Sequence, residues 1–245
     1  MTLFKCICKG LHEEDKLRVI KAISDQATRE YAVRCSLDML DKDVKNLEFY
    51  FENAPDGMTP ITKKTHQIIR KFEEYSVRCN VLKNNPYVKI CLNDLLDLER
   101  TVKTTSELVA EWILFQRNWL YLNGIFCRQE MVKQPELSTA MKYFQQIDTL
   151  FRSMIKSISN TPQVYRMANT EKNYLVNLRK ANSDADIARE GLSKFLLDKR
   201  DAFPRLYFLS NEELIDIYGR SDDLIDMIID GKALTFLQNL FEGID

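Results

Sequence analysis

The sequence predicts an all-α fold: an elongated bundle of long helices, with one small β-hairpin near residues 47–62. Only seven of the 245 residues are glycine and six are proline, so the glycine share is less than half the average of roughly 7%. Tight turns depend on these two residues, and a chain with so few of them has few turns. Apolar residues also recur every three or four positions over long stretches, which is typical of amphipathic helices.

The first predicted helix begins at Leu17, because residues 1–16 show no clear period and remain unassigned. Its apolar positions share one face: Leu17, Ile20, Ile23, Ala27, Tyr31, Leu37, Leu40, Val44 and Leu47. In residues 47–52, apolar and polar side chains then alternate loosely, and aromatic residues are frequent. Residues 53–57 end in Gly57 and carry a turn signal, and residues 58–62 can pair back as a second strand. A frayed helix end followed by a loop is the alternative to this hairpin.

The longest predicted helix follows a break at residues 84–86. A helix from about Lys63 to Lys83 precedes the break, and Asn85 can cap the new helix with Pro86 at its first position. The apolar period then continues to Phe126 without proline. A helix of about 38 residues spans about 57 Å, which favours an elongated molecule.

The second half of the chain has the same character. Pro135 opens a helix that ends at residues 160–162, a single turn is expected at 163–167, and a long helix runs from about 171 to the residue before Pro204. Residues 203–209 are predicted to be extended and buried. Ser210 and Glu213 have the spacing of a capping box, which opens a short helix that ends at Gly219. A last helix is expected at about 222–241, and the length suggests two subdomains, about 17–128 and 129–245.

Composition excludes several classes of function. The net charge of −1 gives no electrostatic basis for nucleic-acid binding, and no apolar run reaches the length of a membrane span. The seven glycines are spaced so that neither a P-loop nor a dinucleotide-binding fingerprint can occur. No export signal is evident, so a reducing cytosolic compartment is expected.

Catalytic and metal-binding patterns are equally scarce. The chain has two histidines and no hydrolase or zinc-protease motif. Cys6, Cys8 and His12 form the one cluster that resembles a metal site, but a fourth nearby ligand and the usual cysteine spacing are missing. Reduced thiols are the simpler interpretation, and we expect neither catalytic residues nor a cofactor nor a metal.

Two aromatic groups remain, and each has two interpretations. Trp112, Phe115, Trp119, Tyr121 and Phe126 lie at helical spacing, and Phe203, Tyr207 and Phe208 surround Pro204. Packing in the core explains both groups most simply. A docking surface for a partner is the alternative, because tryptophan and tyrosine are enriched at interface hot spots.

Both groups lie within motifs that resemble one family. Residues 112–126 follow the pattern W-x3-Q-x2-W-x-Y-L-x2-I-F, and residues 192–214 follow L-x2-F-L-x2-K-R-x2-F-P-R-x-Y-F-L-S-N-x-E-L. These patterns resemble the linker region of dynein heavy chains, and the resemblance extends from about residue 17 to the end. The motif Phe208-Leu209-Ser210-Asn211 resembles the axonemal branches of the family more than the cytoplasmic or intraflagellar branches. The residues that match the family motifs, with a role in packing or docking, are Trp112, Gln116, Trp119, Tyr121, Phe126, Lys199, Arg200, Phe203, Pro204, Arg205, Phe208, Ser210 and Glu213.

The resemblance implies a mechanical function. In that family a long helical linker lies across a ring of AAA+ modules, and it bends and straightens as the ring hydrolyses ATP. The segment itself would not be an enzyme, although the parent motor would be a microtubule-stimulated ATPase. Implied partners are the ring of the same heavy chain and, indirectly, intermediate chains, light chains and microtubules, but no nucleic acid or membrane.

The implied location is the cytoplasm and cytoskeleton, including the axoneme of a cilium or flagellum. Because the resemblance stops before the ring, the chain is either an excerpt of a heavy chain or a truncated gene product. A free-standing helical adaptor or scaffold derived from a dynein linker is the alternative function.

Overall fold

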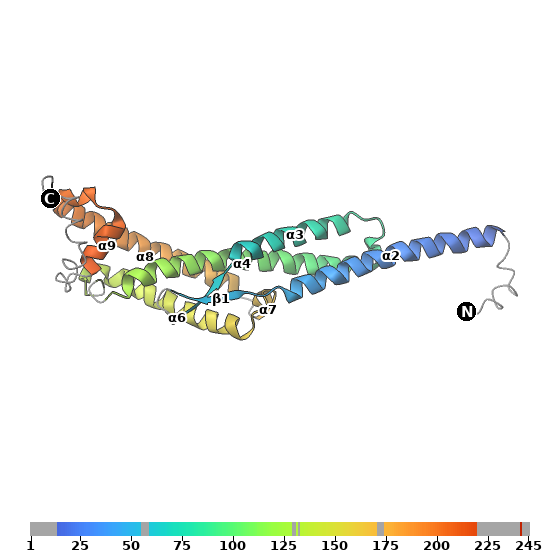
Figure 1. The fold of residues 1–245 in the computed structure, drawn as a ribbon, viewed down its shortest axis with the longest axis horizontal. Coiled ribbons are helices and arrows are strands. Elements are labelled where there is room, and N and C mark those ends of the chain that lie inside the picture. Colours follow the sequence, from blue (N-terminus) through green and yellow to red (C-terminus); the bar gives the residue numbers. More distant parts are fainter. Residues whose placement is uncertain are drawn as a thin grey trace. The chain divides into compact units, whose positions relative to one another are not determined.

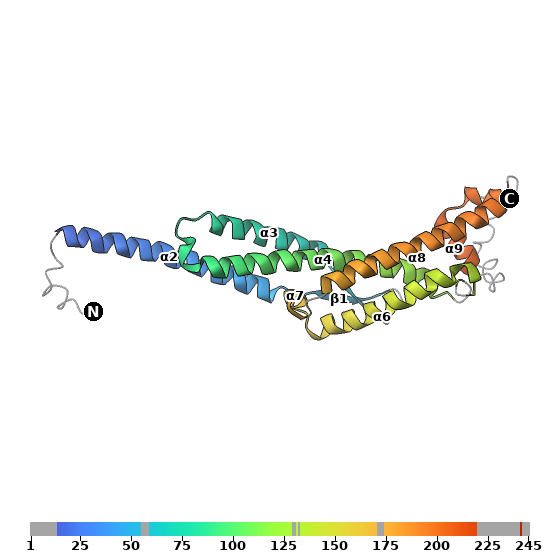
Figure 2. The same cartoon turned by 180° about the vertical axis from the view of Figure 1, so that it is seen from behind.

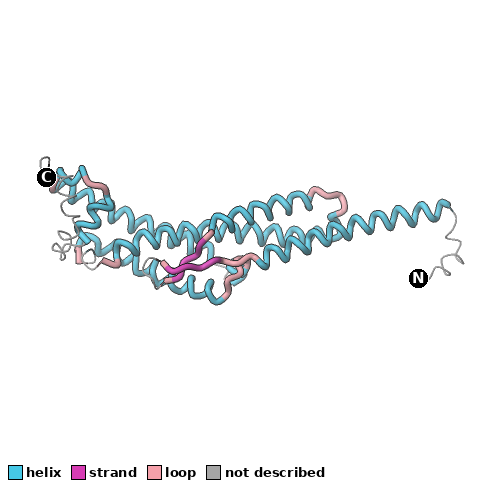
Figure 3. The backbone as a smooth tube through the Cα atoms, viewed as in Figure 1, coloured by secondary structure: helices cyan, strands magenta, loops and turns pink. Residues whose placement is uncertain are grey.

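The structure is a computed structural model, and it describes residues 14–54, 59–128, 131, 133–170, 174–219 and 241. Helices dominate these residues, with one hairpin among them (Figures 1 and 3). The elements, in chain order, are α2 (Glu14–Asn46), β1 (Tyr50–Asn53), β2 (Pro60–Lys63), α3 (Thr65–Lys83), η1 (Val88–Cys91), α4 (Leu92–Phe126), η2 (Pro135–Leu137), α6 (Ser138–Asn160), α7 (Arg166–Thr170), α8 (Tyr174–Ala202), η3 (Pro204–Phe208) and α9 (Asn211–Gly219).

The predicted all-α class with one small hairpin is confirmed. Strands β1 and β2 pair antiparallel, with Tyr50 opposite Lys63 and Asn53 opposite Pro60. Helix α6 ends at Asn160 and α8 ends before Pro204, as predicted. The predicted turn at Gly57, the last helix at 222–241 and the Cys6, Cys8 and His12 cluster lie outside the described residues.

The start of α4 differs from the prediction. The helix begins at Leu92 rather than at Pro86, and the 3-10 turn η1 precedes it. Asn85 does not cap α4, because its Oδ1 accepts a hydrogen bond from the backbone N–H of Tyr87 at 3.0 Å. The asparagine therefore closes a local turn, and the α-helix starts only after that turn.

The chain divides into two compact units. Unit 1 contains Met1–Phe49, Lys64–Glu107 and Gln163–Thr170; unit 2 contains Tyr50–Lys63, Leu108–Pro162 and Glu171–Asp245. Both units are assembled from segments that are distant in the sequence, and helix α4 contributes to each of them.

The core of unit 1 is formed by one face each of α2, α3 and α4. Its fully buried side chains include Leu40, Ile68, Phe72 and Leu95. Only the second half of the predicted apolar stripe of α2 belongs to this core. Leu17, Ile20, Ile23 and Tyr31 are 43–70% exposed. The helical period could not predict this exposure, because it identifies one face of a helix and does not identify what covers that face.

Helices α6 and α8 of unit 2 run side by side in both views (Figures 1 and 2). Small residues allow this close approach: a Cβ added to Gly191 of α8 would lie 3.3 Å from the Cβ of Ala140 in α6. Ala181, Ala185 and Ala188 of α8 are also buried. None of the helices in the described ranges is long and apolar enough to cross a membrane.

Candidate functional site

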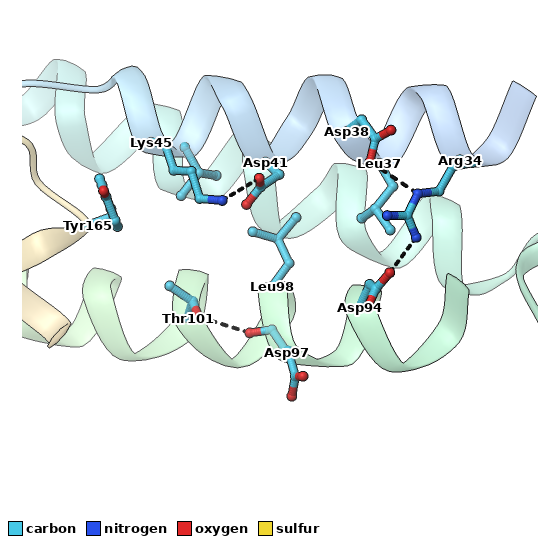
Figure 4. Close-up of a pocket in the computed structure, with 11 residues that line it drawn as sticks. Arg34, Leu37, Asp38, Asp41, Lys45, Asp94, Asp97, Leu98, Thr101 and Tyr165 are labelled. Carbon is cyan, nitrogen blue, oxygen red and sulfur yellow. Dashed lines mark hydrogen bonds and ion pairs between the residues drawn. The ribbon is translucent and has the colours of Figure 1, made fainter. Parts of the chain in front are cut away.

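A groove of about 380 Å³ lies between α2 and α4 in unit 1 (Figure 4). Leu37, Val44 and Leu98 form its apolar part and are buried. Charged side chains surround them, and these are paired: Arg34 contacts Asp38 at 3.2 Å and also contacts Asp94, and Lys45 contacts Asp41 at 2.6 Å.

The groove has the character of a solvated, charged surface. Its ion pairs are exposed, and such pairs contribute only about 0–1 kcal/mol each. No histidine or cysteine lines the groove. In the part of the chain that the structure describes, no group of three or more His, Cys, Asp or Glu side chains could hold a metal ion.

The family-motif residues of α4 form a more specific arrangement in unit 2. Trp112 and Gln116 lie one turn apart on the helix, and both bind Thr62 of strand β2. The backbone N–H and the hydroxyl of Thr62 donate to Gln116 Oε1 at 2.8 and 2.7 Å, and Gln116 Nε2 donates to the Thr62 carbonyl at 2.9 Å. Trp112 Nε1 donates to the Thr62 hydroxyl at 3.0 Å. Every polar group of Thr62 is therefore satisfied by α4.

This contact seals one edge of the hairpin. Because the backbone groups of Thr62 bind Gln116, they face away from Phe51, the residue opposite Thr62 in β1. The side-chain amide of Gln116 thus makes the two hydrogen bonds that the backbone of a neighbouring strand would make with Thr62. The outer edge of β2, whose backbone groups would otherwise face water, is covered in this way. Thr62 and Gln116 are only 2% and 8% exposed, so these hydrogen bonds are shielded from solvent.

Trp112 and Trp119 also hold a ring from α6 between them. Phe151 is nearly parallel to both indoles, with centroid distances of 5.5 Å to Trp112 and 4.0 Å to Trp119. Two residues seven positions apart on a helix are separated by about 10 Å, which leaves room for one ring. All three side chains are fully buried, and this stack joins α4 to α6.

Trp119 connects the stack to the hairpin by a second route. Its Nε1 donates to Asp148 Oδ1 at 2.9 Å, and Asp148 accepts two hydrogen bonds from Arg152 Nε at 3.0 and 2.9 Å. Arg152 reaches the hydroxyl of Thr59 at 3.4 Å. The motif on α4, the next helix and the hairpin therefore form one connected core.

The remaining motif residues of α4 have different surroundings. Phe126 is 2% exposed and stacks on Phe144 of α6 at 5.3 Å. Tyr121 is 41% exposed and lies under the guanidinium of Arg189, 5.4 Å from the ring centroid. Partial burial raises the pKa of the Tyr121 phenol, and Arg189 opposes that rise.

The second motif builds a loop at the end of α8 that hydrogen bonds from Arg200 hold in place. Arg200 Nη2 donates to the Leu209 carbonyl at 2.8 Å, Nη1 donates to Asn211 Oδ1 at 2.8 Å, and Nε reaches the Leu206 carbonyl at 3.4 Å. Lys199 pairs with Glu136 at 3.3 Å. The predicted capping box is confirmed.

In the capping box, the backbone N–H of Ser210 donates to Glu213 Oε2 at 2.7 Å, and that of Glu213 donates to Ser210 Oγ at 3.2 Å. The start of α9 is thereby fixed.

The prediction that residues 203–209 are extended and buried was wrong. Residues 204–208 form the 3-10 turn η3, in which Pro204 occupies an initial position that its fixed φ favours. Leu206 and Leu209 are buried, whereas Phe203, Tyr207 and Phe208 are 44%, 55% and 72% exposed. Pro204 and Arg205 are exposed as well, with the guanidinium of Arg205 4.8 Å from the Phe241 ring centroid.

The structure therefore separates the predicted site residues into two groups. Trp112, Gln116, Trp119 and Phe126 lie in the core of unit 2. The second motif presents aromatic side chains on a loop whose ends are fixed. The spacing of motif residues did not identify Thr62 or Phe151 as their partners. The apolar residues of α6 that recur every three or four positions, Phe144, Ile147, Leu150 and Met154, pass beside Phe151 without including it.

The first motif packs into a helical core and the second caps a helix, so both motifs have structural contacts in the described part of this all-α chain. The comparisons with known proteins agree with the motif resemblance. The sequence model described as "Dynein heavy chain, N-terminal region 2" matches residues 1–245. The chain belongs to the dynein heavy chain family, as an N-terminal region.

Relatives include dynein axonemal heavy chain 1 of Rattus norvegicus, 29% identical over 216 residues, which are 88% of this chain and 5% of the relative. Dynein axonemal heavy chain 12 of Rattus norvegicus is 25% identical over 229 residues, 93% of this chain and 7% of the relative. The ciliary dynein beta chain of Tripneustes gratilla is 27% identical over 223 residues, 91% of this chain and 5% of the relative. The chain thus spans only a small part of the length of these relatives.

Proposed function

We propose that this chain is a linker, or lever, segment of a dynein heavy chain that couples ATP-driven changes in the AAA+ ring to movement along microtubules. The segment performs no catalysis and needs no cofactor. Its direct partner is the ring of the same heavy chain, and microtubules, intermediate chains and light chains are reached indirectly. The names of its axonemal and ciliary relatives favour a location in the axoneme.

The observation that carries this proposal is the continuity of α4 and its attachment to neighbouring elements. The helix is unbroken from Leu92 to Phe126, and buried side chains occur along it from Leu95 to Phe126. A lever must transmit force without flexing, and a helix that is packed along its length is suited to this. The nucleotide state of the ring must then favour one linker shape over another.

A bend is proposed at one of two places where the chain leaves a helix. Helix α3 ends at Lys83, before Asn84–Pro86, and α6 ends at Asn160, before Pro162. A covalent crosslink across the bending point should abolish motility in the heavy chain that carries this segment. Unchanged motility with crosslinks across both places would contradict the proposal.

Docking on the ring is assigned to the exposed members of the two aromatic groups, which are Tyr121 in the first and Phe203, Tyr207 and Phe208 in the second. Trp112 and Trp119 cannot dock, since they are fully buried. The double change F203A/F208A should lower gliding velocity and leave thermal stability nearly unchanged, because both side chains are exposed. V176A removes an exposed apolar side chain from α8 and serves as the control. If F203A/F208A glides like V176A, the docking role is wrong.

The alternative is a free-standing adaptor, and the size of the native protein separates the two. An antibody raised to this chain should detect a band many times heavier than 28.7 kDa that binds microtubules in an ATP-sensitive way. A band near 28.7 kDa would favour the adaptor, since no ring could then belong to the same chain.

A further inference from the structure

A row of polar side chains crosses the apolar core of unit 2 between α4 and α8. Asn182 Nδ2 donates to Glu111 Oε2 at 2.9 Å and to the Glu111 carbonyl at 3.2 Å, and Asn118 Nδ2 donates to Asn182 Oδ1 at 3.3 Å. Arg179 and Arg189 bind the two ends of the row, through Glu111 Oε1 at 3.2 Å and Asn118 Oδ1 at 3.5 Å. We call these five residues the polar row.

The centre of the polar row is buried among apolar residues. Asn118 and Asn182 are 2% and 5% exposed. One turn away, the buried neighbours are Phe115 and Leu122 on α4, and Leu178 and Ala185 on α8. Within the described residues, no buried side-chain nitrogen or oxygen lacks a hydrogen-bond partner. The amides are therefore satisfied in the arrangement that the structure shows.

Apolar contacts are non-directional, so they define the axial position of α8 less sharply than hydrogen bonds do. The side of α8 toward α6 carries the small residues Ala181 and Gly191 beside the longer Asn177 and Lys180. A slide of one helical turn moves a side chain by about 5.4 Å, which is well beyond the reach of a hydrogen bond. After such a slide, both buried amides would face apolar side chains, and unpaired buried amides are costly.

We propose that the buried pair Asn118–Asn182, with Glu111, sets the axial register of α8 against α4. Apolar packing supplies the attraction between the helices, and the amide pair adds a hydrogen-bonding requirement that only one axial arrangement meets. A buried polar pair is well suited to this task, because it adds little stability but penalises every other register. The proposal is independent of the lever function.

The test compares register with stability in the 245-residue chain, using methyl NMR of Leu122, Leu178 and Leu192. Each single change, N118L or N182L, leaves one buried polar group of the remaining amide without its partner and should lower Tm by roughly 3–10 °C. The double change N118L/N182L should recover most of that loss. Its methyl groups on α8 should nevertheless give two sets of signals, where the wild type gives one.

F144L is the matched control, because it weakens an apolar contact of α4 with α6. It should lower Tm and keep a single set of signals. N118A/N182A, which adds no volume to the core, should double the signals if N118L/N182L does not fold. A single set of signals with native contacts in the double variant overturns the proposal, and so does signal doubling in F144L.

Discussion

Gln116→Glu should destabilise the protein although it changes the shape of the side chain very little. The introduced carboxylate can still accept from the N–H and hydroxyl of Thr62, but nothing then donates to the Thr62 carbonyl, which Gln116 Nε2 now reaches at 2.9 Å. An unpaired buried carbonyl costs about 1–3 kcal/mol. The charge at a site that is 8% exposed adds to this, and we expect a total loss of roughly 2–4 kcal/mol at pH 7.

The loss should depend on pH in a defined direction. Burial disfavours the charged form, and the protonated form can donate to the Thr62 carbonyl again, so the pKa of the introduced carboxyl is higher in the folded than in the unfolded chain. A raised pKa means that the folded state binds the proton more tightly. The variant should therefore approach wild-type stability below the unfolded value of about 4.3, and lose stability as the pH rises through the folded value.

Urea unfolding followed by circular dichroism, at several pH values between 4 and 7.5, measures this effect. Gln145→Glu is the matched control, since Gln145 is exposed on α6, and it should change stability by less than about 0.5 kcal/mol. If the two variants are equally stable at pH 7, or if the Gln116→Glu loss does not change with pH, the explanation of the Thr62 contact is refuted.

Three further substitutions test two other contacts and one backbone conformation. The measurement for each is the free energy of unfolding in urea. Phe151→Ala should cost about 3–5 kcal/mol, because it empties the space between Trp112 and Trp119; a cost below 1 kcal/mol would contradict the stack. Ser210→Ala should cost about 1 kcal/mol by removing the cap of α9, and an unchanged midpoint would argue against it. Lys64→Gly should stabilise by about 0.5–1 kcal/mol, because Lys64 has a φ of 55°; destabilisation would show that its side chain matters more than this backbone strain.

Local signals were read correctly from the sequence. The Ser210–Glu213 capping box is complete within four residues, so its geometry follows from spacing alone. The end of α8 follows in the same way from Pro204. In both cases one short segment contains all the groups that determine the structure.

Contacts between distant segments could not be read in this way. Thr62 and Gln116 are 54 residues apart, and no period or spacing links a strand threonine to a helix glutamine over that distance. The prediction for residues 203–209 failed for a related reason. The loop is held by Arg200 of the preceding helix, which donates hydrogen bonds to backbone carbonyls of the loop, and the sequence does not show this contact. The proline motif predicted a departure from helix but not the exposed 3-10 turn that follows.

The stack around Phe151 has a practical consequence. The chain contains two tryptophans, and both lie in this one cluster. Intrinsic indole fluorescence therefore monitors a single place in unit 2, while the helical signal averages over the whole chain. If the fluorescence and the helical signal change at different temperatures, the two units unfold in separate steps. If both signals change at the same temperature, the chain unfolds as one cooperative body. The protein thus carries its own optical reporter for the core of unit 2, without any added label.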